Sequence, residues 1–485
     1  MNLALFIPEL TLAVFAVLVI LPDMGVQKKA WLAKLSLAGL VIAAGAAVTM
    51  WGDSPQTLFG SLLAVDNFAL FFKLLFCGIA FLVILGSADY ANRFARFQGE
   101  YYALILLSTL GMMLMAAAAD LITLYISLEL TSISLYVLVG FLKDRKSTEA
   151  SLKYLLLGAV ASAVLLYGMA LVFGVTGHTQ LGAIFAALQG MGGSSIVSNP
   201  ALMLGIVMLV AGFGFKIAAV PFQMWVPDVY EGAPTTITAY LSVGSKAAGF
   251  AIILRVFFTA FELPWLSEGW GLIFAVLAVI SMFVGNLTAI PQANIKRMLG
   301  YSSIAQAGYL MVGLATIGFA PASVTVGQAG ILFFLASYAL TNLGAFITVI
   351  AISDRIESDQ IEDFAGMFKR APVLALALTF CLISLIGMPP AAGFMGKFYI
   401  FSGAVQHGLL WLVIIAVINS VISAYYYLRV VKVMWFGQAP SEEKITSTAA
   451  PRLAIFLCCL GVLVLGVIPG LVMGLAGIAG KMLTF

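Results

Sequence analysis

The chain has 485 residues, of which 62% are hydrophobic and only 9% are charged, against roughly 45–50% and about 25% in soluble domains. This composition excludes a soluble globular enzyme, and a formal net charge of +3 gives no reason to expect a nucleic-acid partner. We therefore expect a polytopic protein of the lipid bilayer, with little sequence left for a soluble domain.

Apolar runs bounded by charged residues, Pro or Gly predict about fourteen transmembrane helices. The runs are long and continuous, without the alternation that membrane β-barrels need, so the predicted fold class is an all-α polytopic membrane bundle. In chain order the expected spans are 3–21, 30–51, 66–86, 101–118, 120–142, 151–175, 201–226, 233–257, 269–290, 294–316, 325–353, 371–405, 408–434 and 451–477.

Basic residues gather in alternate loops between these spans, whereas the opposite loops hold mainly acidic residues such as Asp53 and Glu262. Because Lys and Arg mark cytoplasmic loops, the basic loops are expected to face the cytoplasm, with both termini on the outer side of the membrane. The basic set includes Lys28, Lys34, Arg93, Lys143, Lys296, Arg297, Arg355, Lys369 and Arg429, and Lys481 falls near the last span.

Four lysines and one glutamate fall inside the predicted spans: Glu129, Lys153, Lys216, Lys246 and Lys397. Each charge at the centre of a helix costs about 2.5–3.5 kcal/mol even on the lenient insertion scale, and such residues usually carry function. A lysine can change its charge state when burial and nearby carboxylates shift its pKa, so a row of them can pass protons. The alternative for any one of them is a structural ion pair or a side chain that reaches the interface.

Lys73 is treated apart from these residues. It lies seven residues after Asp66, and its long stem could reach the outer interface. We therefore expect Lys73 to extend to the membrane surface rather than to carry protons.

Hydroxyl groups accompany one of the lysines at helical spacing. Thr235, Thr238 and Ser242 recur every three or four residues before Lys246, which predicts one polar helix face and a water-lined path. Ordinary hydrogen bonding between membrane helices is the alternative explanation.

Proline and glycine interrupt two spans close to a lysine. Pro221 follows Lys216, and Pro389 and Pro390 precede Lys397. Proline breaks a helix, and broken helices at membrane depth line cavities or ion paths. The two interrupted spans, seven and twelve, are five spans apart, which predicts two inverted five-helix repeats, spans 4–8 and 9–13. The expected organisation is residues 1–100 for the first three helices, 101–260 and 261–435 for the repeats, and 436–485 for the last helix.

Cofactor signatures are absent from the sequence. Cys77, Cys381, Cys458 and Cys459 lie in apolar runs without a C-x-x-C spacing, and there is no phosphate-binding loop or dinucleotide fingerprint. The two histidines, His178 and His407, fall in or near predicted outer loops. We therefore expect this chain to bind no metal and no redox cofactor.

Several motifs together resemble the subunit N family of the proton-pumping NADH:quinone oxidoreductase, respiratory complex I, whose mitochondrial counterpart is subunit 2. The resemblance covers essentially the whole chain. Its most specific stretches are 127–130 (SLEL), 149–154 (EASLKY), 214–216 (GFK), 225–234 (WVPDVYEGAP), 294–303 (NIKRMLGYSS) and 393–399 (GFMGKFY).

The resemblance implies roles for the intramembrane residues. Glu129 and Lys216 would form a coupled charge pair, Lys153 would modulate Lys216, Lys246 would carry protons across the centre, and Lys397 would be the terminal group toward the outside. A departure is that Gln223 and Gln306 stand where some relatives carry His, so a histidine step is not expected here.

The resemblance also implies partners. NADH, FMN, iron–sulfur clusters and quinone would belong to other subunits, and the expected neighbours are antiporter-like subunit M and small membrane subunits. Lys397 and the short C-terminal end favour subunit N over the related subunits M and L. Two alternatives stay open: a subunit of an Mrp-type cation/proton antiporter, and an inert scaffold of a respiratory complex.

Overall fold

The computed structural model describes residues 3–23, 29–94, 97–193, 199–319, 325–439, 441 and 443–480. Lys28 and Lys481 lie outside the described residues.

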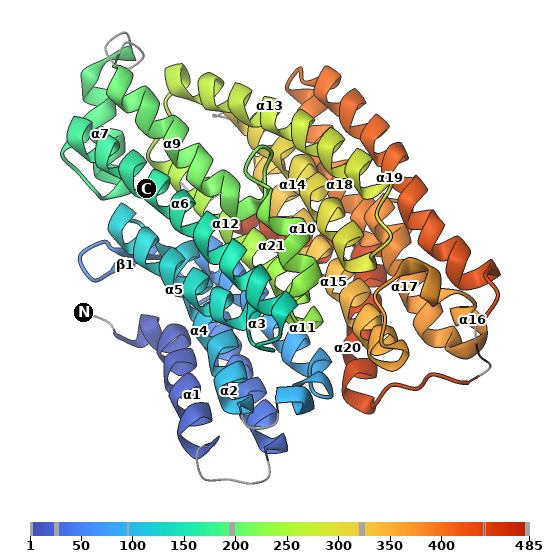
Figure 1. Ribbon diagram of the computed structural model, residues 1–485. Helices are drawn as coiled ribbons and strands as arrows, with labels where there is room; N and C mark the ends of the chain where they lie inside the picture. Colours follow the sequence, from blue (N-terminus) through green and yellow to red (C-terminus); the bar gives the residue numbers. More distant parts are fainter. Residues whose placement is uncertain are drawn as a thin grey trace.

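The described chain forms an α-helical bundle with one short β-hairpin (Figure 1). Thirteen of the described helices are long and apolar enough to cross a membrane. The α-helices are α1 (Ile7–Asp23), α2 (Ala30–Thr49), α3 (Asn67–Gly86), α4 (Gln98–Ala117), α5 (Leu121–Val139), α6 (Arg145–Thr176), α7 (Leu181–Met191), α9 (Pro200–Ile217), α10 (Trp225–Gly232), α11 (Thr235–Tyr240), α12 (Lys246–Thr259), α13 (Pro264–Ala289), α14 (Ile295–Phe319), α15 (Thr325–Ile356), α16 (Met367–Arg370), α17 (Pro372–Ile386), α18 (Ala392–Gln406), α19 (Leu410–Phe436), α20 (Ala449–Val467) and α21 (Gly470–Gly480).

The predicted all-α bundle is confirmed, and each predicted span has a helix in place. Spans seven, eight and twelve are each divided into two helices, α9 and α10, α11 and α12, and α17 and α18. The last span is shorter than predicted, because Pro469 lies between α20 and α21, where its ring removes a backbone donor.

Two small elements were not predicted. Helix α7 occupies the long connection after α6, and strands β1 (Gln56–Leu58) and β2 (Leu63–Val65) pair antiparallel between α2 and α3. The hairpin turn includes Gly60 at a φ of +68°, a backbone conformation that glycine adopts without steric cost.

The ends of the helices form two rims. At one rim, Leu63 pairs with Ala118, and Asp120 pairs with Gln180, so the hairpin contacts the ends of α4 and α5 and the start of α7. We call this the hairpin rim. Leu5 packs onto the same hairpin, and Gly480 packs beside Gln328 at the start of α15.

The opposite rim carries the basic loops and is called the basic rim. There Asn294 pairs with Gln360, Arg93 forms an ion pair with Asp354, and Arg429 donates a hydrogen bond to the carbonyl of Ile290 at 2.8 Å. These contacts tie together loops that are far apart in sequence.

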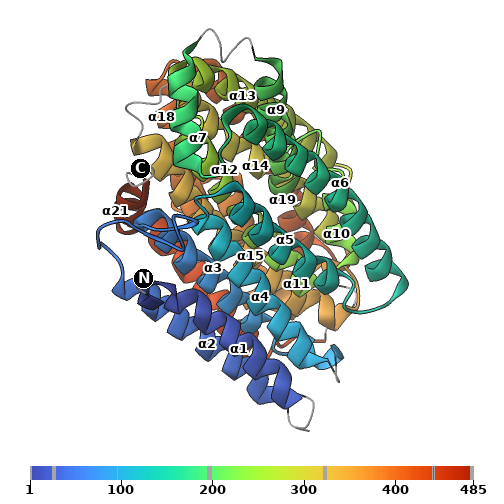
Figure 2. The same ribbon diagram turned by 90° about the vertical axis from the view of Figure 1, so that its left-hand side faces the viewer.

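Three membrane-spanning segments form the centre of the bundle. The most apolar window is fully buried in Thr235–Thr259, 94% buried in Ile295–Phe319 and 89% buried in Gly327–Ile356. In contrast, α1 and α2 lie at one edge of the bundle, as two views at right angles show (Figures 1 and 2). The central helices α11, α12, α14 and α15 are therefore shielded from lipid.

Three helix interruptions lie near the lysines. Ala218 ends α9 at a φ of +62°, and Pro221 lies in the segment before α10. Gly387 ends α17 at a φ of +93°, and Pro389 and Pro390 lie before α18. The third interruption was not predicted: a π-helical segment, Leu241–Ser245, separates α11 from α12.

Candidate functional site

Lys216 lies in the last turn of α9, where its side chain is buried. Its Nζ donates a hydrogen bond to Ser132 Oγ of α5 at 2.5 Å. Glu129 stands one turn earlier on α5 and accepts a hydrogen bond from Ser162 Oγ of α6 at 2.5 Å. The structure therefore brings Lys216 and Glu129 to neighbouring turns of α5, and among the described residues they form no direct ion pair.

Lys246 is the first residue of α12, directly after the π-helical segment. Its Nζ donates to Ser303 of α14, both to the carbonyl oxygen and to Oγ, the latter at 2.6 Å. Tyr338 of α15 donates to the same Ser303 Oγ at 3.2 Å, and its ring lies 5.8 Å from the ammonium. Lys246 is thus surrounded by hydroxyl, carbonyl and aromatic groups.

Lys397 lies in α18, beside the end of α17. Its Nζ donates to the carbonyls of Leu385 and Ile386 at 3.2 and 2.8 Å, and to Ser420 Oγ at 3.1 Å. An ammonium group has three donors, and here each has an acceptor. The negative end of the α17 dipole also favours a cation at this position, and the Tyr309 ring lies 4.3 Å away.

Helix α14 connects the surroundings of Lys246 and Lys397. Ser303 contacts Lys246, and one turn later Gln306 donates to the Leu385 carbonyl at 3.1 Å, the same oxygen that Lys397 contacts. A further turn along, Tyr309 carries the ring that faces Lys397. The two lysines are therefore linked by one polar side of α14.

Three other buried cations, Lys73, Arg255 and Lys296, have carboxylate partners. Arg255 pairs with Asp66 at 2.5 Å, and Lys296 pairs with Asp359 at 3.4 Å. Lys73 is 1% exposed and pairs with Glu9 at 2.7 Å, so the expectation that it reaches the membrane surface is wrong. Glu9, in the first span, was the signal that could have indicated this pair.

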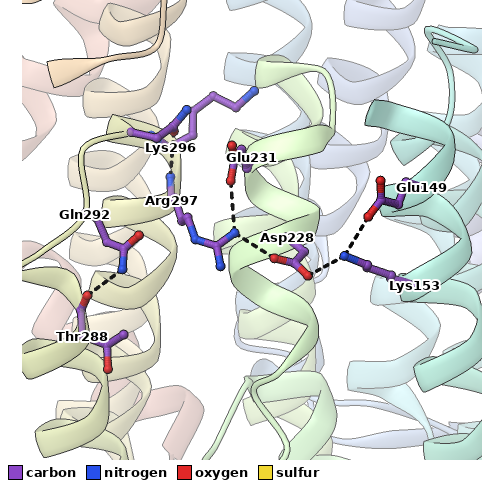
Figure 3. Close-up of polar contacts among 9 residues, drawn as sticks. Glu149, Lys153, Asp228, Glu231, Thr288, Gln292, Lys296 and Arg297 are labelled. Atoms are coloured by element: carbon purple, nitrogen blue, oxygen red, sulfur yellow. Dashed lines mark hydrogen bonds and ion pairs between the residues drawn. The ribbon is translucent and has the colours of Figure 1, made fainter. Parts of the chain in front are cut away.

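Lys153 occupies a different environment from Lys216, Lys246 and Lys397. It is 44% exposed and forms ion pairs with Glu149 at 2.9 Å and Asp228 at 2.8 Å. Asp228 of α10 also forms an ion pair with Arg297 of α14, at 2.7 Å (Figure 3). Lys153 lies in a candidate membrane span, as predicted, and the structure shows ion pairs of the kind left open as the alternative for each lysine. Lys153 joins a network that links α6, α10 and α14, and Arg297 extends this network to Glu231 at 3.0 Å.

The ion pairs of this network lower the pKa of Asp228. Burial raises the pKa of this carboxyl, but the hydrogen bonds and charges of Lys153 and Arg297 outweigh burial and lower it overall. Asp228 is therefore ionised near neutral pH, and it holds α10, the helix that follows the break after Lys216, to its two neighbours.

The predicted hydroxyl row leads from the basic rim to Lys246. Thr235 lines a cleft of about 590 Å³ at that rim, together with Lys296 and Asp359. Further along, Ser242 lies in the π-helical segment and accepts a hydrogen bond from Asn342 Nδ2 at 2.7 Å. Asn342, a buried amide on α15, was not predicted from the sequence.

Lys397 also borders a second cavity. A groove of about 580 Å³ between α18 and α19 is lined mainly by apolar side chains such as Phe394, Phe398 and Val417, and includes Lys397. Among the described residues, no group of three or more His, Cys, Asp or Glu is placed to hold a metal ion. His407 Nδ1 lies 2.8 Å from the Gly403 carbonyl, within its own helix end.

Known proteins resemble this chain over nearly its full length. A family model described as "NADH:quinone oxidoreductase/Mrp antiporter, TM" matches residues 118–423. NADH-quinone oxidoreductase subunit N of Dehalococcoides mccartyi is 51% identical, with 96% of each chain covered.

Two solved structures have the same fold. A chain of respiratory complex I from Thermus thermophilus is 33% identical with a TM-score of 0.81, covering 97% of this chain and 99% of that one. A chain of the Mrp complex from Dietzia sp. has a TM-score of 0.85 and covers 100% and 98%, but at 20% identity it shows the fold alone. The family match and the full-length relatives agree, and the chain therefore belongs to the family of NADH-quinone oxidoreductase subunit N, the antiporter-like membrane subunits of respiratory complex I.

Proposed function

We propose that this chain translocates protons as a membrane subunit of NADH:quinone oxidoreductase, driven by quinone reduction in other subunits. Protons would move from the cytoplasm, at the basic rim, to the outside, at the hairpin rim. NADH, FMN, iron–sulfur clusters and quinone would be bound elsewhere in the complex. The proposed neighbours are antiporter-like subunit M and small membrane subunits of a bacterial inner membrane.

One observation carries this proposal: Lys216, Lys246 and Lys397 are buried, and within the described part of the chain none has a carboxylate within 4.0 Å. An unpaired buried charge is energetically unfavourable. A buried lysine without a carboxylate partner therefore loses its proton at a lower free-energy cost than a paired one. Lys73, Arg255 and Lys296, by contrast, each form an ion pair with a carboxylate.

The proposed path runs from the cytoplasm through Lys216 and Lys246 to Lys397. The cleft at the basic rim would supply water along Thr235 to Lys246, and the polar side of α14 would link Lys246 to Lys397 through Ser303 and Gln306. Hydroxyl, amide and carbonyl groups can hold the waters that carry protons between such sites.

Glu129 and Lys153 would regulate Lys216 in this scheme. A negative Glu129 one turn from the Ser132 contact stabilises the ammonium of Lys216. If charge shifts in the neighbouring subunit separate the two, Lys216 loses that stabilisation and its proton is released toward the centre. Lys153 would modulate this step through Asp228, because Asp228 lies on α10, after the break that follows Lys216.

The rival function is a subunit of an Mrp-type antiporter, which would share the lysines and the broken helices. Subunit N relatives at 51% identity favour the oxidoreductase over the Mrp chain at 20%. Neighbouring genes would separate the two: complex I subunits in one case, small antiporter subunits in the other.

The test is a chromosomal Lys216→Met exchange, with NADH oxidation and proton uptake followed together in inverted membrane vesicles. We expect both rates to fall sharply while the complex still assembles. Lys432→Met is the matched control, because Lys432 is exposed on α19 and should be dispensable. Wild-type rates in Lys216→Met would contradict the relay.

A further inference from the structure

The groove between α18 and α19 that includes Lys397 opens toward the bilayer. Its volume is about 580 Å³, and its walls are mainly apolar. On the α18 side, the rings of Phe394 and Phe398 are stacked, with centroids 6.1 Å apart. Phe398 of α18 and Val421 of α19 both line the groove and are 52% and 70% exposed. An apolar molecule dissolved in lipid can therefore enter between the two helices.

This groove contains a cation but no carboxylate. Lys397 is 5% exposed, and the described residues that line the groove include no Asp or Glu. The other polar side chains in its wall are Ser402 and Ser420. Lys397 Nζ donates to Ser420 Oγ at 3.1 Å, so one donor of the ammonium points to a residue of the groove wall. The charge of the groove is thus complementary to an anion with an apolar body.

The depth of Lys397 limits which anion can reach it. Helix α18 ends at Gln406, beside the start of α15, where a Cβ at Gly403 would lie 3.8 Å from Gly327 Cα. At a rise of about 1.5 Å per residue, Lys397 lies roughly 14 Å along the helix from that end. The hydrocarbon core of a bilayer is about 30 Å thick. Lys397 is therefore near its middle, too deep for the phosphate of a lipid headgroup at the membrane surface.

We propose that this groove binds a long-chain carboxylic acid, with its hydrocarbon chain against Phe398 and Val417 and its carboxylate on Lys397. The volume lies within the range of about 300–1,000 Å³ that is usual for small-molecule sites. A carboxylic acid loses its charge when protonated, so it can reach this depth in the neutral form. When Lys397 is deprotonated, its amine takes the proton of the acid, and the ammonium and the carboxylate form together as an ion pair.

The ion pair has a consequence that rests on the proposed function. A nearby opposite charge favours the charged form of a lysine, so the bound carboxylate would keep the proton on Lys397. The last step of the proposed relay, proton release from Lys397 to the outside, would then be slowed. A bound fatty acid is therefore expected to inhibit proton translocation by this chain.

The first measurement is photolabelling of the purified complex with a palmitic acid that carries a diazirine on its chain. Mass spectrometry of this chain should find the label on α18 or α19, at the groove. Val417→Trp should lower this labelling at least fivefold, because the indole would fill the groove. Ile418→Trp is the matched control and should keep the label: Ile418 is 49% exposed and Val417 is 48% exposed, but of the two only Val417 lines the groove.

Competition identifies the head group of the occupant. Palmitic acid should displace the probe. Methyl palmitate, which has no ionisable group, and dioleoylphosphatidylglycerol, whose anionic phosphate stays at the membrane surface, should not. Equal competition by methyl palmitate would show an apolar groove only, and competition by phosphatidylglycerol would show a phospholipid site. Either result overturns the proposal, as does the absence of label from the groove in the intact complex, which a helix of a neighbouring subunit seated there would cause.

NADH oxidation in inverted vesicles is the second measurement, taken as the ratio of the rates with and without palmitic acid. Palmitic acid that carries protons across the bilayer raises this ratio in every variant, whereas occupation of the groove lowers it. The ratio should be at least twofold lower in wild-type and Ile418→Trp vesicles than in Val417→Trp vesicles. Labelling without this difference overturns the effect on Lys397 and leaves the binding site standing. Failure of the proton relay itself would be seen separately, as wild-type pumping in Lys216→Met.

Discussion

The carbonyl oxygen of Leu385 accepts two hydrogen bonds, from Lys397 Nζ at 3.2 Å and from Gln306 Nε2 at 3.1 Å. In Gln306→Leu, the Leu385 carbonyl would accept a hydrogen bond from Lys397 alone. It would therefore bind the Lys397 ammonium more strongly. A hydrogen bond contributes about 1 kcal/mol, which corresponds to about a fivefold slower proton release. Proton uptake in inverted vesicles measures this effect.

Gln292→Leu is the matched control for this exchange. Gln292 donates to the Thr288 carbonyl at 2.9 Å, at the basic rim (Figure 3), and in the described structure no hydrogen bond joins its side chain to Lys216, Lys246 or Lys397. Proton uptake should stay at the wild-type rate. Equal losses in both glutamine variants would argue against a specific role of Gln306.

Asp228 leads to a prediction about pH. Although burial raises its pKa, Lys153 and Arg297 lower it overall, so the contribution of this carboxylate is present above its ordinary pKa of about 3.9 and is lost only as the pH falls through the lowered value. Asp228→Asn should therefore reduce proton uptake several-fold, and by the same factor at pH 6 and pH 8.

Glu149→Gln provides the comparison, because Glu149 is 60% exposed and contacts Lys153 alone in this network. Its effect should be small, as expected for an exposed pair. A deficit of Asp228→Asn that disappears at either pH would show that the residue titrates in this range, contrary to the geometry.

The parts of the candidate site that depend on the identity of single residues could be predicted from the sequence. The cost of a buried charge was enough to single out Lys216, Lys246 and Lys397. It could not reveal the ion pairs of Lys73 and Lys153, because the partners Glu9 and Asp228 come from other helices. Asn342 was missed for the same reason: its contact with Ser242 joins residues 100 positions apart.

At the scale of helices, the long spans were predictable because a bilayer requires about 20 apolar residues with internally satisfied backbone groups. The interruption after Gly387 was indicated by Pro389 and Pro390. No such signal marks the π-helical segment Leu241–Ser245, which contains no proline. The hairpin and α7 lie between the spans, where apolarity carries no information about backbone structure.

The two helix ends near Lys216 and Lys397 differ in one testable respect. Ala218 holds a φ of +62°, which costs a residue with a side chain about 1–2 kcal/mol. Ala218→Gly should be tolerated, because relief of that strain offsets the greater freedom of glycine in the unfolded chain.

Gly387→Ala should be harmful, since it would create the same strain at a φ of +93° and place a Cβ 3.0 Å from Lys397 Cδ. The expected result is a twofold or greater loss of proton uptake per NADH oxidised, with Ala218→Gly unchanged. Equal behaviour of the two variants would contradict this account of the helix ends.

At the scale of the whole molecule, two buried ion pairs fasten the N-terminal helices to the rest of the bundle. Asp66, at the start of α3, pairs with Arg255 near the end of α12. Glu9 of α1 pairs with Lys73 of α3, and its Oε2 has no hydrogen-bond partner among the described residues. These pairs join α1 and α3 to each other and to the helix that begins with Lys246.

Removal of one partner should show what the Glu9–Lys73 pair contributes. Lys73→Met leaves a buried, uncompensated carboxylate, which costs about 3–5 kcal/mol, so less complex should assemble and its thermal unfolding midpoint should fall. The double exchange Glu9→Met with Lys73→Met should recover most of the loss, because two apolar side chains of similar volume replace the pair without a buried charge. In both variants the surviving complex should keep the wild-type ratio of protons to NADH, since the pair lies outside the proposed relay. A lowered ratio in the double variant would instead place α1 and α3 within the proton path.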